Sequence, residues 1–201
     1  MTLIARKDMP AKDFKELLAY VKANKDKVTL ANAGVGSASH LCGLLFMTAI
    51  QTELTTAPYK GTAPAMNDIM GGQVDLLCDQ TTQTTSYIAS GRVKAYGTTS
   101  KTRVDSLKDL PTLAESGLPG FEVVVWHGLY APKDTPRPVL DKLQAALQTA
   151  IADPAFVQKM ADLGSQVVAR DKATPEGLRT QLKGEIDKWT PIIRKAGVYA
   201  D

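Results

Sequence analysis

A serine, a histidine and an aspartate in this 201-residue sequence are of the types that form a hydrolytic catalytic trio. Ser37 and His40 lie in the segment ANAGVGSASHLCGLLF (31–46), and Asp79 follows a later apolar stretch. In such trios a base activates the hydroxyl nucleophile and a carboxylate orients the base. The G-x-S-x-G pattern of a nucleophile elbow is absent around Ser37, and a helix N-terminus disfavours protonation of His40. A small α/β hydrolase or transferase therefore stays an alternative, and we expect His40 to be a structural support.

The same segment begins like a dinucleotide-binding loop, because Gly34 and Gly36 are spaced as G-x-G. Ser39 stands where that fingerprint has its third glycine, and the acidic residue Glu53 precedes the next strand instead of ending it. These departures argue against a nucleotide, and no cofactor is expected.

A third interpretation is a cradle for an anion that is bound without being changed. Backbone N–H groups of residues 36–39, at the start of a helix, are suited to hold a carboxylate. The hydroxyls of Ser37 and Ser39 would add donors, Ser39 would cap the helix, and Gly34 and Gly36 would support the turn. Glycine and serine are also ordinary turn formers, so a purely structural role stays open at this point.

Two further polar loops are expected at the same edge of the sheet. Asp79 is suited to accept a hydrogen bond from a ligand hydroxyl or ammonium, or to cap the helix that follows, and Gln80 and Thr81 lie in the same loop. Tyr59 would contact a ligand or seal the cleft, and Lys60 would offset a carboxylate charge or be a solvated turn residue. These loops make a binding site more plausible than the glycine segment does alone.

Alternating apolar runs and amphipathic segments predict the elements that position these loops. Strands at 3–5, 28–32, 54–58, 74–78 and 93–98 alternate with helices. This alternation is typical of an α/β fold with a largely parallel sheet flanked by helices. Binding loops in such folds lie at the carboxyl ends of the strands.

The last third of the sequence has a different character. Residues 121–130 (FEVVVWHGLY) predict a long strand, and 166–169 predict a short one. Three helices are expected to open at Thr135-Pro136, Asp153-Pro154 and Thr174-Pro175, where each pair supplies a cap and a first-turn proline. Their wide apolar stripes need a surface to cover, and the sequence offers them little sheet of their own.

Composition limits the classes of function. The net charge is +3, and the basic residues form no stripe with interleaved aromatics, which argues against nucleic-acid binding. No run is apolar enough for a transmembrane helix, and the first residues do not read as a signal peptide. The two histidines and two cysteines fit no metal spacing, so no metal is expected. Buried free thiols are the favoured state of Cys42 and Cys78, with a disulfide as the alternative.

Several segments, in order and spacing along nearly the whole chain, resemble the Bug-type periplasmic receptors of tripartite tricarboxylate transporters. They are NAGVGSASHL (32–41), APYKGTAPA (57–65), GGQVD (71–75), SGRVKA (90–95), LPTLAESGLPGFE (110–122) and AGV (196–198). The resemblance implies a solute-binding receptor with two α/β lobes around a cleft. Such a receptor captures a small carboxylate, presents it to membrane permease subunits and catalyses nothing.

The resemblance also implies roles for individual residues. The ligand-binding share of this chain falls on Ser37, Ala38, Ser39 and the 79–82 loop, with a lesser contribution from the Tyr59-Lys60 turn.

The resemblance implies a division into lobes as well. Residues 1–125 correspond to the second lobe, and residues 126–201 to a crossover strand and the C-terminal helices of the first lobe, whose N-terminal part is absent. The exposed apolar helix faces would then favour a homo-oligomer. A self-associating module derived from the receptor is therefore a further alternative.

Overall fold

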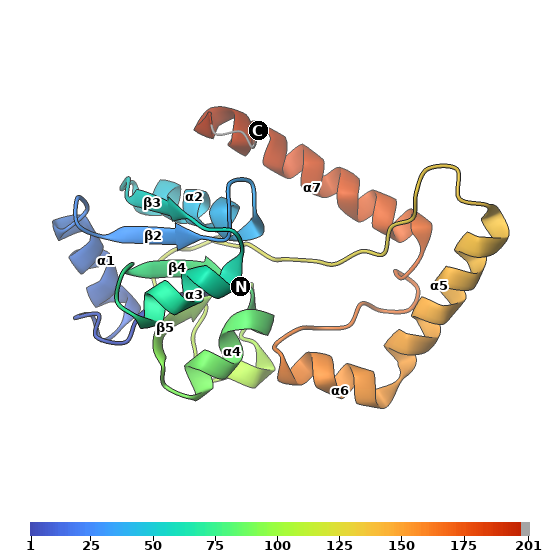
Figure 1. Cartoon of the computed structure of the whole chain (residues 1–201), viewed down its shortest axis with the longest axis horizontal. Helices are drawn as coiled ribbons and strands as arrows, with labels where there is room; N and C mark the ends of the chain where they lie inside the picture. The colour runs from blue at the N-terminus through green and yellow to red at the C-terminus, as the bar shows by residue number, and fades with distance from the viewer. Residues whose placement is uncertain (198–201) are drawn as a thin grey trace. The chain divides into compact units, whose positions relative to one another are not determined.

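The structure is a computed structural model and describes residues 1–197, so Val198 of the closing AGV segment lies outside the described residues. The chain divides into two compact units (Figure 1), which are described separately: Met1–Val125 and Trp126–Gly197.

The first unit is built on a five-stranded sheet with the order β3-β2-β4-β1-β5. The strands are β1 (Thr2–Arg6), β2 (Thr29–Asn32), β3 (Thr55–Pro58), β4 (Leu76–Asp79) and β5 (Val93–Thr98). β2 pairs in parallel with β3 and β4, which confirms the predicted α/β class with a largely parallel sheet.

β1 is the exception, because it pairs antiparallel with both β4 and β5. Its first residue, Thr2, is therefore opposite Asp79, the last residue of β4. A parallel arrangement had been expected from the strand–helix alternation. The helix between β1 and β2 is nevertheless compatible with either direction, so alternation alone could not fix the direction of this strand.

Helices connect these strands. They are α1 (Phe14–Ala23), α2 (Ala38–Ile50), α3 (Thr62–Met70) and α4 (Thr81–Ala89), followed by a 3-10 turn, η1 (Asp105–Leu107). Helices α2, α3 and α4 follow β2, β3 and β4 after short loops. Because these three strands run in the same direction, the three helices begin at one edge of the sheet.

The core of this unit is formed where the helices cover the sheet. Ile4 and Leu77, on the central strands, are both 0% exposed, and the rings of Phe14 and Phe46 lie 6.5 Å apart between α1 and α2.

Cys42 on α2 and Cys78 on β4 form a disulfide, with their Cα atoms 6.0 Å apart. The favoured prediction of free thiols is therefore wrong. The fold, not the 36-residue separation in sequence, brings the two residues within bonding range.

Residues 121–130 form no strand, contrary to the prediction. The backbone N–H of Val123 donates to the carbonyl of Thr99 (2.9 Å), and the hydroxyl of Thr99 donates to the carbonyl of Val123. Phe121 and Val123 are buried at 8% and 1% exposure. The apolar composition of this segment therefore reflects burial of single side chains, since no partner strand continues the pairing among the described residues.

The second unit contains α5 (Arg137–Ala152), α6 (Pro154–Asp162) and α7 (Pro175–Ala196). Asp153 and Thr174 cap α6 and α7 as predicted. Thr135 does not cap α5, because its hydroxyl donates to the carbonyl of Pro132 (2.8 Å) and Pro136 takes the cap position. The strand predicted at 166–169 is absent from the described residues, which are irregular there.

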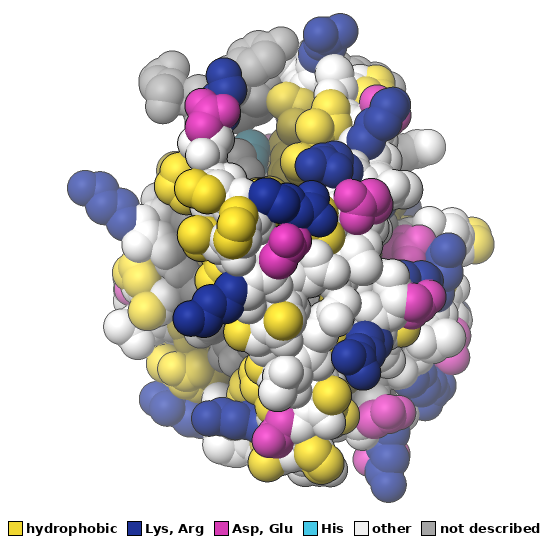
Figure 2. All heavy atoms as spheres, turned by 90° about the vertical axis from the view of Figure 1, so that its right-hand side faces the viewer, with side chains coloured by type: hydrophobic (Ala, Val, Ile, Leu, Met, Phe, Trp, Pro, Cys, Tyr) yellow, Lys and Arg dark blue, Asp and Glu magenta, His cyan; other side chains and the backbone are white. Residues whose placement is uncertain are grey.

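Apolar side chains of these helices are exposed. No residue of α5 or α6 is buried, and Figure 2 shows hydrophobic side chains among charged ones on the face that carries α5. Val139 and Leu143 on α5 are 47% and 39% exposed. Among residues 1–197, no helix is long and apolar enough to cross a membrane, and no cluster of ligating side chains is suited to a metal ion.

Candidate anion-binding site

Three loops meet at the edge of the sheet where α2, α3 and α4 begin (Figure 1). The loops after β2 and β3 are joined by backbone hydrogen bonds. Tyr59 N–H donates to the carbonyl of Asn32 (3.0 Å), and Gly61 N–H donates to the carbonyl of Ala33 (3.2 Å). These two hydrogen bonds therefore hold the loops after β2 and β3 against each other.

The turn before α2 depends on its glycines. Gly34 has φ +120°, and a Cβ atom at this position would lie 3.1 Å from the carbonyl oxygen of Tyr59. Gly36 has φ +78°, which also favours glycine. The side-chain oxygen of Asn32 accepts the Gly34 N–H at 3.0 Å, and Ser37 N–H donates to the carbonyl of Gly34 at 3.1 Å. The conformation of the turn is thus fixed by its two glycines and by these hydrogen bonds.

Ser37 is the N-cap of α2, since its hydroxyl oxygen accepts the backbone N–H of His40 at 3.1 Å. Ser39, the predicted cap, is instead the second residue of the helix, two positions after the cap. It is 3% exposed, and its hydroxyl donates to the carbonyl of Cys78 at 2.7 Å. The expectation that the Ser39 hydroxyl serves as a ligand donor is therefore corrected. What Ser39 offers is its backbone N–H, which, like that of Ala38, has no acceptor within the helix.

His40 supports this turn directly. Its Nδ1 accepts the backbone N–H of Gly36 at 3.2 Å, and the residue is 7% exposed. Burial lowers the pKa of His40, so the neutral imidazole is favoured. The support role expected for His40 agrees with this geometry.

Asp79 ends β4 and is 1% exposed. One carboxylate oxygen accepts the backbone N–H of Gln80 at 2.7 Å, and the other accepts the hydroxyl of Thr62 at 2.7 Å. Burial raises the pKa of Asp79, and both hydrogen bonds act in the opposite direction. Asp79 therefore joins the starts of α3 and α4. Sequence reasoning did not single out Thr62, although its place directly after Gly61 at a strand end was a usable signal.

The supposed catalytic trio is not assembled. The ring of His40 bonds to Gly36, and the carboxylate of Asp79 bonds to Gln80 and Thr62. Among residues 1–197, no hydrogen bond joins the side chains of Ser37, His40 and Asp79.

Tyr59 and Lys60 occupy the loop after β3. The phenol of Tyr59 donates to a carboxylate oxygen of Asp68 at 2.6 Å, which raises the pKa of Tyr59 to about 12. Lys60 is exposed. The hydroxyl of Tyr59 is thus directed to α3. The aromatic ring of Tyr59 is therefore the part of this side chain that is free to contact a ligand.

Gln80 and Thr81 mark a second helix N-terminus at this edge of the sheet. Gln80 is the N-cap of α4 and makes no side-chain capping bond, and Thr81 is the first helical residue, at 9% exposure. Because β2 and β4 are adjacent and parallel, α2 and α4 follow neighbouring strand ends at the same edge of the sheet. Both N-termini carry partial positive charge and first-turn N–H groups.

A group of buried threonines was missed by sequence reasoning. Thr2 and Thr84 are 0% exposed, and their hydroxyl oxygens lie 2.7 Å apart. Thr84 also donates to the carbonyl of Gln80 at 3.1 Å, which places the pair behind the start of α4. The expected parallel direction of the first strand would have put Thr2 at the opposite edge of the sheet. The antiparallel direction of β1 brings it here.

The Cys42–Cys78 disulfide reinforces the same edge. Cys78 is adjacent to Asp79, and Cys42 lies one turn after Ala38 on α2. Together with the bond from Ser39 to the carbonyl of Cys78, it fixes the start of α2 against the end of β4.

Comparison with known proteins gives a consistent result. The model of the tripartite tricarboxylate transporter family receptor matches residues 1–198. A relative from Agrobacterium vitis, the UPF0065 protein in the TAR-I ttuE-ttuC' intergenic region, is 48% identical over 197 residues, which are 98% of this chain and 57% of the relative.

Among the solved structures that resemble this chain are two bacterial binding proteins. The periplasmic binding protein BugD is 55% identical, with a TM-score of 0.93 over 100% of this chain and 67% of that one. MatC from Rhodopseudomonas palustris with bound malate is 36% identical, with a TM-score of 0.90 over 96% of this chain and 65% of that one. The chain thus spans 57% of the length of the Agrobacterium relative and about two thirds of these two structures.

The family model covers nearly the whole chain, and the relatives and solved structures agree with it. This confirms the resemblance to the Bug-type receptors of tripartite tricarboxylate transporters. The chain belongs to the receptor family of the tripartite tricarboxylate transporters.

Proposed function

We propose that this chain captures a small carboxylate at the paired N-termini of α2 and α4, as part of a receptor that delivers it to a membrane permease. The observation that carries the proposal is the first turn of α2. Ser37 caps it, and the N–H groups of Ala38 and Ser39 have no acceptor within the helix. Such a turn stabilises a carboxylate through hydrogen bonds and the helix dipole.

The contacts are assigned as follows. Ala38 and Ser39 donate backbone N–H groups, and the hydroxyl of Ser37 donates its proton while its oxygen stays bonded to His40. Gln80 and Thr81 contribute from the start of α4, and the Tyr59-Lys60 turn borders the ligand. Asp79 is assigned the role of holding the site together, since its two carboxylate oxygens accept hydrogen bonds from Thr62 and Gln80.

Membership in the family supports a wider setting for this site. Residues 1–125 act as the second lobe of a periplasmic receptor, and residues 126–201 as the connection to the first lobe and its C-terminal helices. MatC, 36% identical to this chain, has been solved with bound malate, which supports a small carboxylate as ligand. The exposed apolar side chains of α5 and α6 support self-association of this chain, to be measured by light scattering. A strictly monomeric particle would contradict that part.

A thermal-shift and calorimetric series tests the binding proposal. Succinate, malate, adipate and citrate are each titrated, with the fully amidated compound of each acid as the uncharged control. At least one carboxylate should raise the midpoint of unfolding in a saturable way, since a ligand that binds only the native state stabilises it. Ser37→Ala should weaken that response, whereas Ser86→Ala, which removes an exposed hydroxyl from α4, should not. No response to any carboxylate, together with hydrolysis of an ester or thioester, would sink the proposal.

A further inference from the structure

His40 has two ring nitrogens, and the fold accounts for only one of them. Nδ1 accepts the Gly36 N–H at 3.2 Å, so Nδ1 carries a lone pair and no proton. A doubly protonated ring would have no lone pair on Nδ1 to accept this bond, so the geometry requires the neutral ring, and burial, which lowers the pKa of His40, acts in the same direction. A neutral imidazole with a free Nδ1 lone pair has its proton on Nε2, which makes Nε2–H a hydrogen-bond donor.

No group among residues 1–197 accepts the proton of Nε2, although His40 is only 7% exposed. Because no described protein group uses this donor, it is available to a ligand wherever the atom can be reached. Among the described side chains, only the hydroxyl of Ser106 is both sealed from solvent and unpartnered. The Nε2 of His40 is therefore not enclosed by protein and can be reached from outside.

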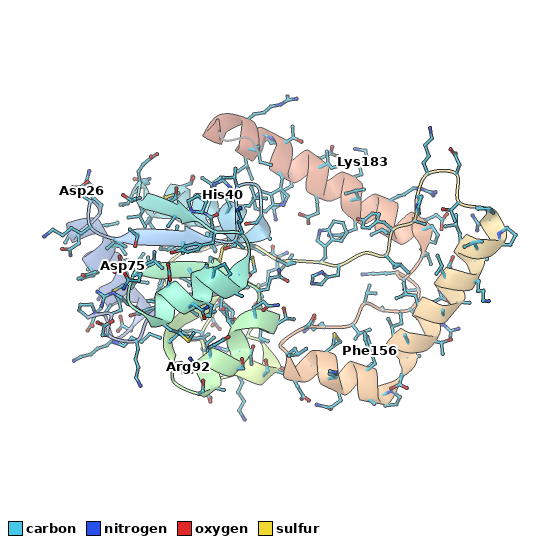
Figure 3. All side chains as sticks on the ribbon, viewed as in Figure 1. Asp26, His40, Asp75, Arg92, Phe156 and Lys183 are labelled. Atoms are coloured by element: carbon cyan, nitrogen blue, oxygen red, sulfur yellow. A yellow bond between two sulfur atoms is a disulfide. The ribbon has the colours of Figure 1, made fainter. Side chains whose placement is uncertain are left out.

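The position of the ring places this donor at the proposed site. His40 is the third residue of α2, and side chains in a helix lean toward its N-terminus. The bond to Gly36 holds the ring against the turn that precedes the helix, and Figure 3 shows His40 in this region. The ring thus lies beside the first-turn N–H groups that are proposed to bind the carboxylate.

We propose that Nε2–H of His40 donates a hydrogen bond to the bound carboxylate, while Nδ1 fixes the turn through Gly36. This inference rests on the proposed function and adds a side-chain contact to it. A neutral donor suits the position, because it binds an anion without placing a charged cation in a largely buried position. The histidine thereby couples the shape of the turn to recognition of the ligand.

Two substitutions separate the roles of the two nitrogens. In His40→Asn the amide oxygen can take the place of Nδ1 and accept from Gly36, but the side chain is too short to reach the position of Nε2. In His40→Gln the amide nitrogen can take the place of Nε2, and the acceptor for Gly36 is lost. Asn should therefore preserve the unfolding midpoint and weaken malate binding about tenfold or more, as expected for a hydrogen bond to a charged group. His40→Gln should lower the unfolding midpoint and preserve malate binding.

The experiment uses the 201-residue chain, with malate affinity measured by calorimetry and stability measured by circular dichroism. His127→Asn is the matched control, since His127 is exposed and should affect neither quantity. In the unsubstituted chain, nitrogen-15 NMR should show the proton of His40 on Nε2, and malate should shift that proton's resonance and slow its exchange.

The outcomes are decisive in either direction. Malate binding by His40→Asn equal to that of the unsubstituted chain overturns the inference, and so does a proton on Nδ1. If both variants lose stability, the NMR titration decides, and an unchanged Nε2–H signal at saturating malate refutes the contact. Failure of the unsubstituted chain to bind any carboxylate overturns the proposed function and this inference together, whereas intact binding with an indifferent His40 overturns only the latter.

Discussion

Leu77 in the first unit is 0% exposed, whereas Leu182 in the second unit, a residue of the same type on α7, is 37% exposed. The contrast is general, because the first unit wraps helices around a sheet and α5 and α6 contain no buried residue. An apolar helix stripe thus becomes core only where the same unit supplies a surface to cover. Stability and the candidate site should therefore depend on the first unit, and substitutions in the second should matter little in this chain.

The largest expected effect comes from the disulfide. Cys42→Ala combined with Cys78→Ala, or reduction of the bond, should lower the free energy of unfolding by about 3 to 4 kcal/mol, because the bond closes a long loop in the unfolded chain. Urea unfolding followed by circular dichroism measures this. The second unit contains no cysteine, so helical signal from α5–α7 should persist after reduction. Loss of all helical signal in one step would contradict the separation of the two units.

A matched leucine pair tests the contrast in packing. Leu77→Ala should destabilise the chain by about 3 kcal/mol through loss of burial and creation of a cavity. Leu182→Ala should cost less than about 0.5 kcal/mol, because its side chain is already partly solvated. Both values come from the same urea titrations. Equal losses for the two variants would show that α7 is buried against something in solution.

Acidification should weaken the first unit through His40. Its pKa is lowered by burial, so the unfolded state takes up a proton before the native state does. The stabilisation is complete above the ordinary histidine pKa, about 6.5, and declines as the pH falls below that value toward the lower native pKa. Unfolding midpoints between pH 7.5 and 5 should show this decline, and His40→Asn should reduce it. An unchanged slope in the variant would assign the effect to other groups.

Asp79 should change the pH dependence of stability in the opposite direction to His40. We expect this effect to be the smallest of the four. Its pKa is raised by burial, so native Asp79 keeps its proton at a pH where the unfolded chain has already lost it. Stability from this residue therefore decreases as the pH rises through the native pKa. Asp79→Asn keeps an oxygen for Gln80 and should remove this part of the pH dependence. The comparison of unfolding midpoints between acidic and neutral buffer measures it, and identical profiles would contradict the expectation.

The elements of the first unit were predictable because apolar runs and caps are local signals. The loops at the carboxyl ends of β2, β3 and β4 followed from the parallel pattern, and so did most of the residues that line the candidate site. The direction of β1 was not predictable, because strand pairing depends on partners distant in sequence. Because the direction of β1 was not predicted, the pairing of Thr2 with Thr84 near the candidate site was missed.

Three other misses have similar causes. The pairing of Cys42 with Cys78 depends on how α2 lies on β4, and sequence spacing contains no record of it. Ser39 was taken as a cap, but its burial against β4 directs its hydroxyl to Cys78, and Ser37 has the extended backbone that a cap needs. The segment 121–130 has strand composition without a strand partner, so composition alone misled.

The turn of residues 32–37 is closed by hydrogen bonds to protein groups alone. Binding there requires little ordering of backbone, so the conformational entropy lost on association should be small. Carboxylates of different size would then meet the same ordered surface at similar association rates. Discrimination among them should appear mainly in how long each one stays bound.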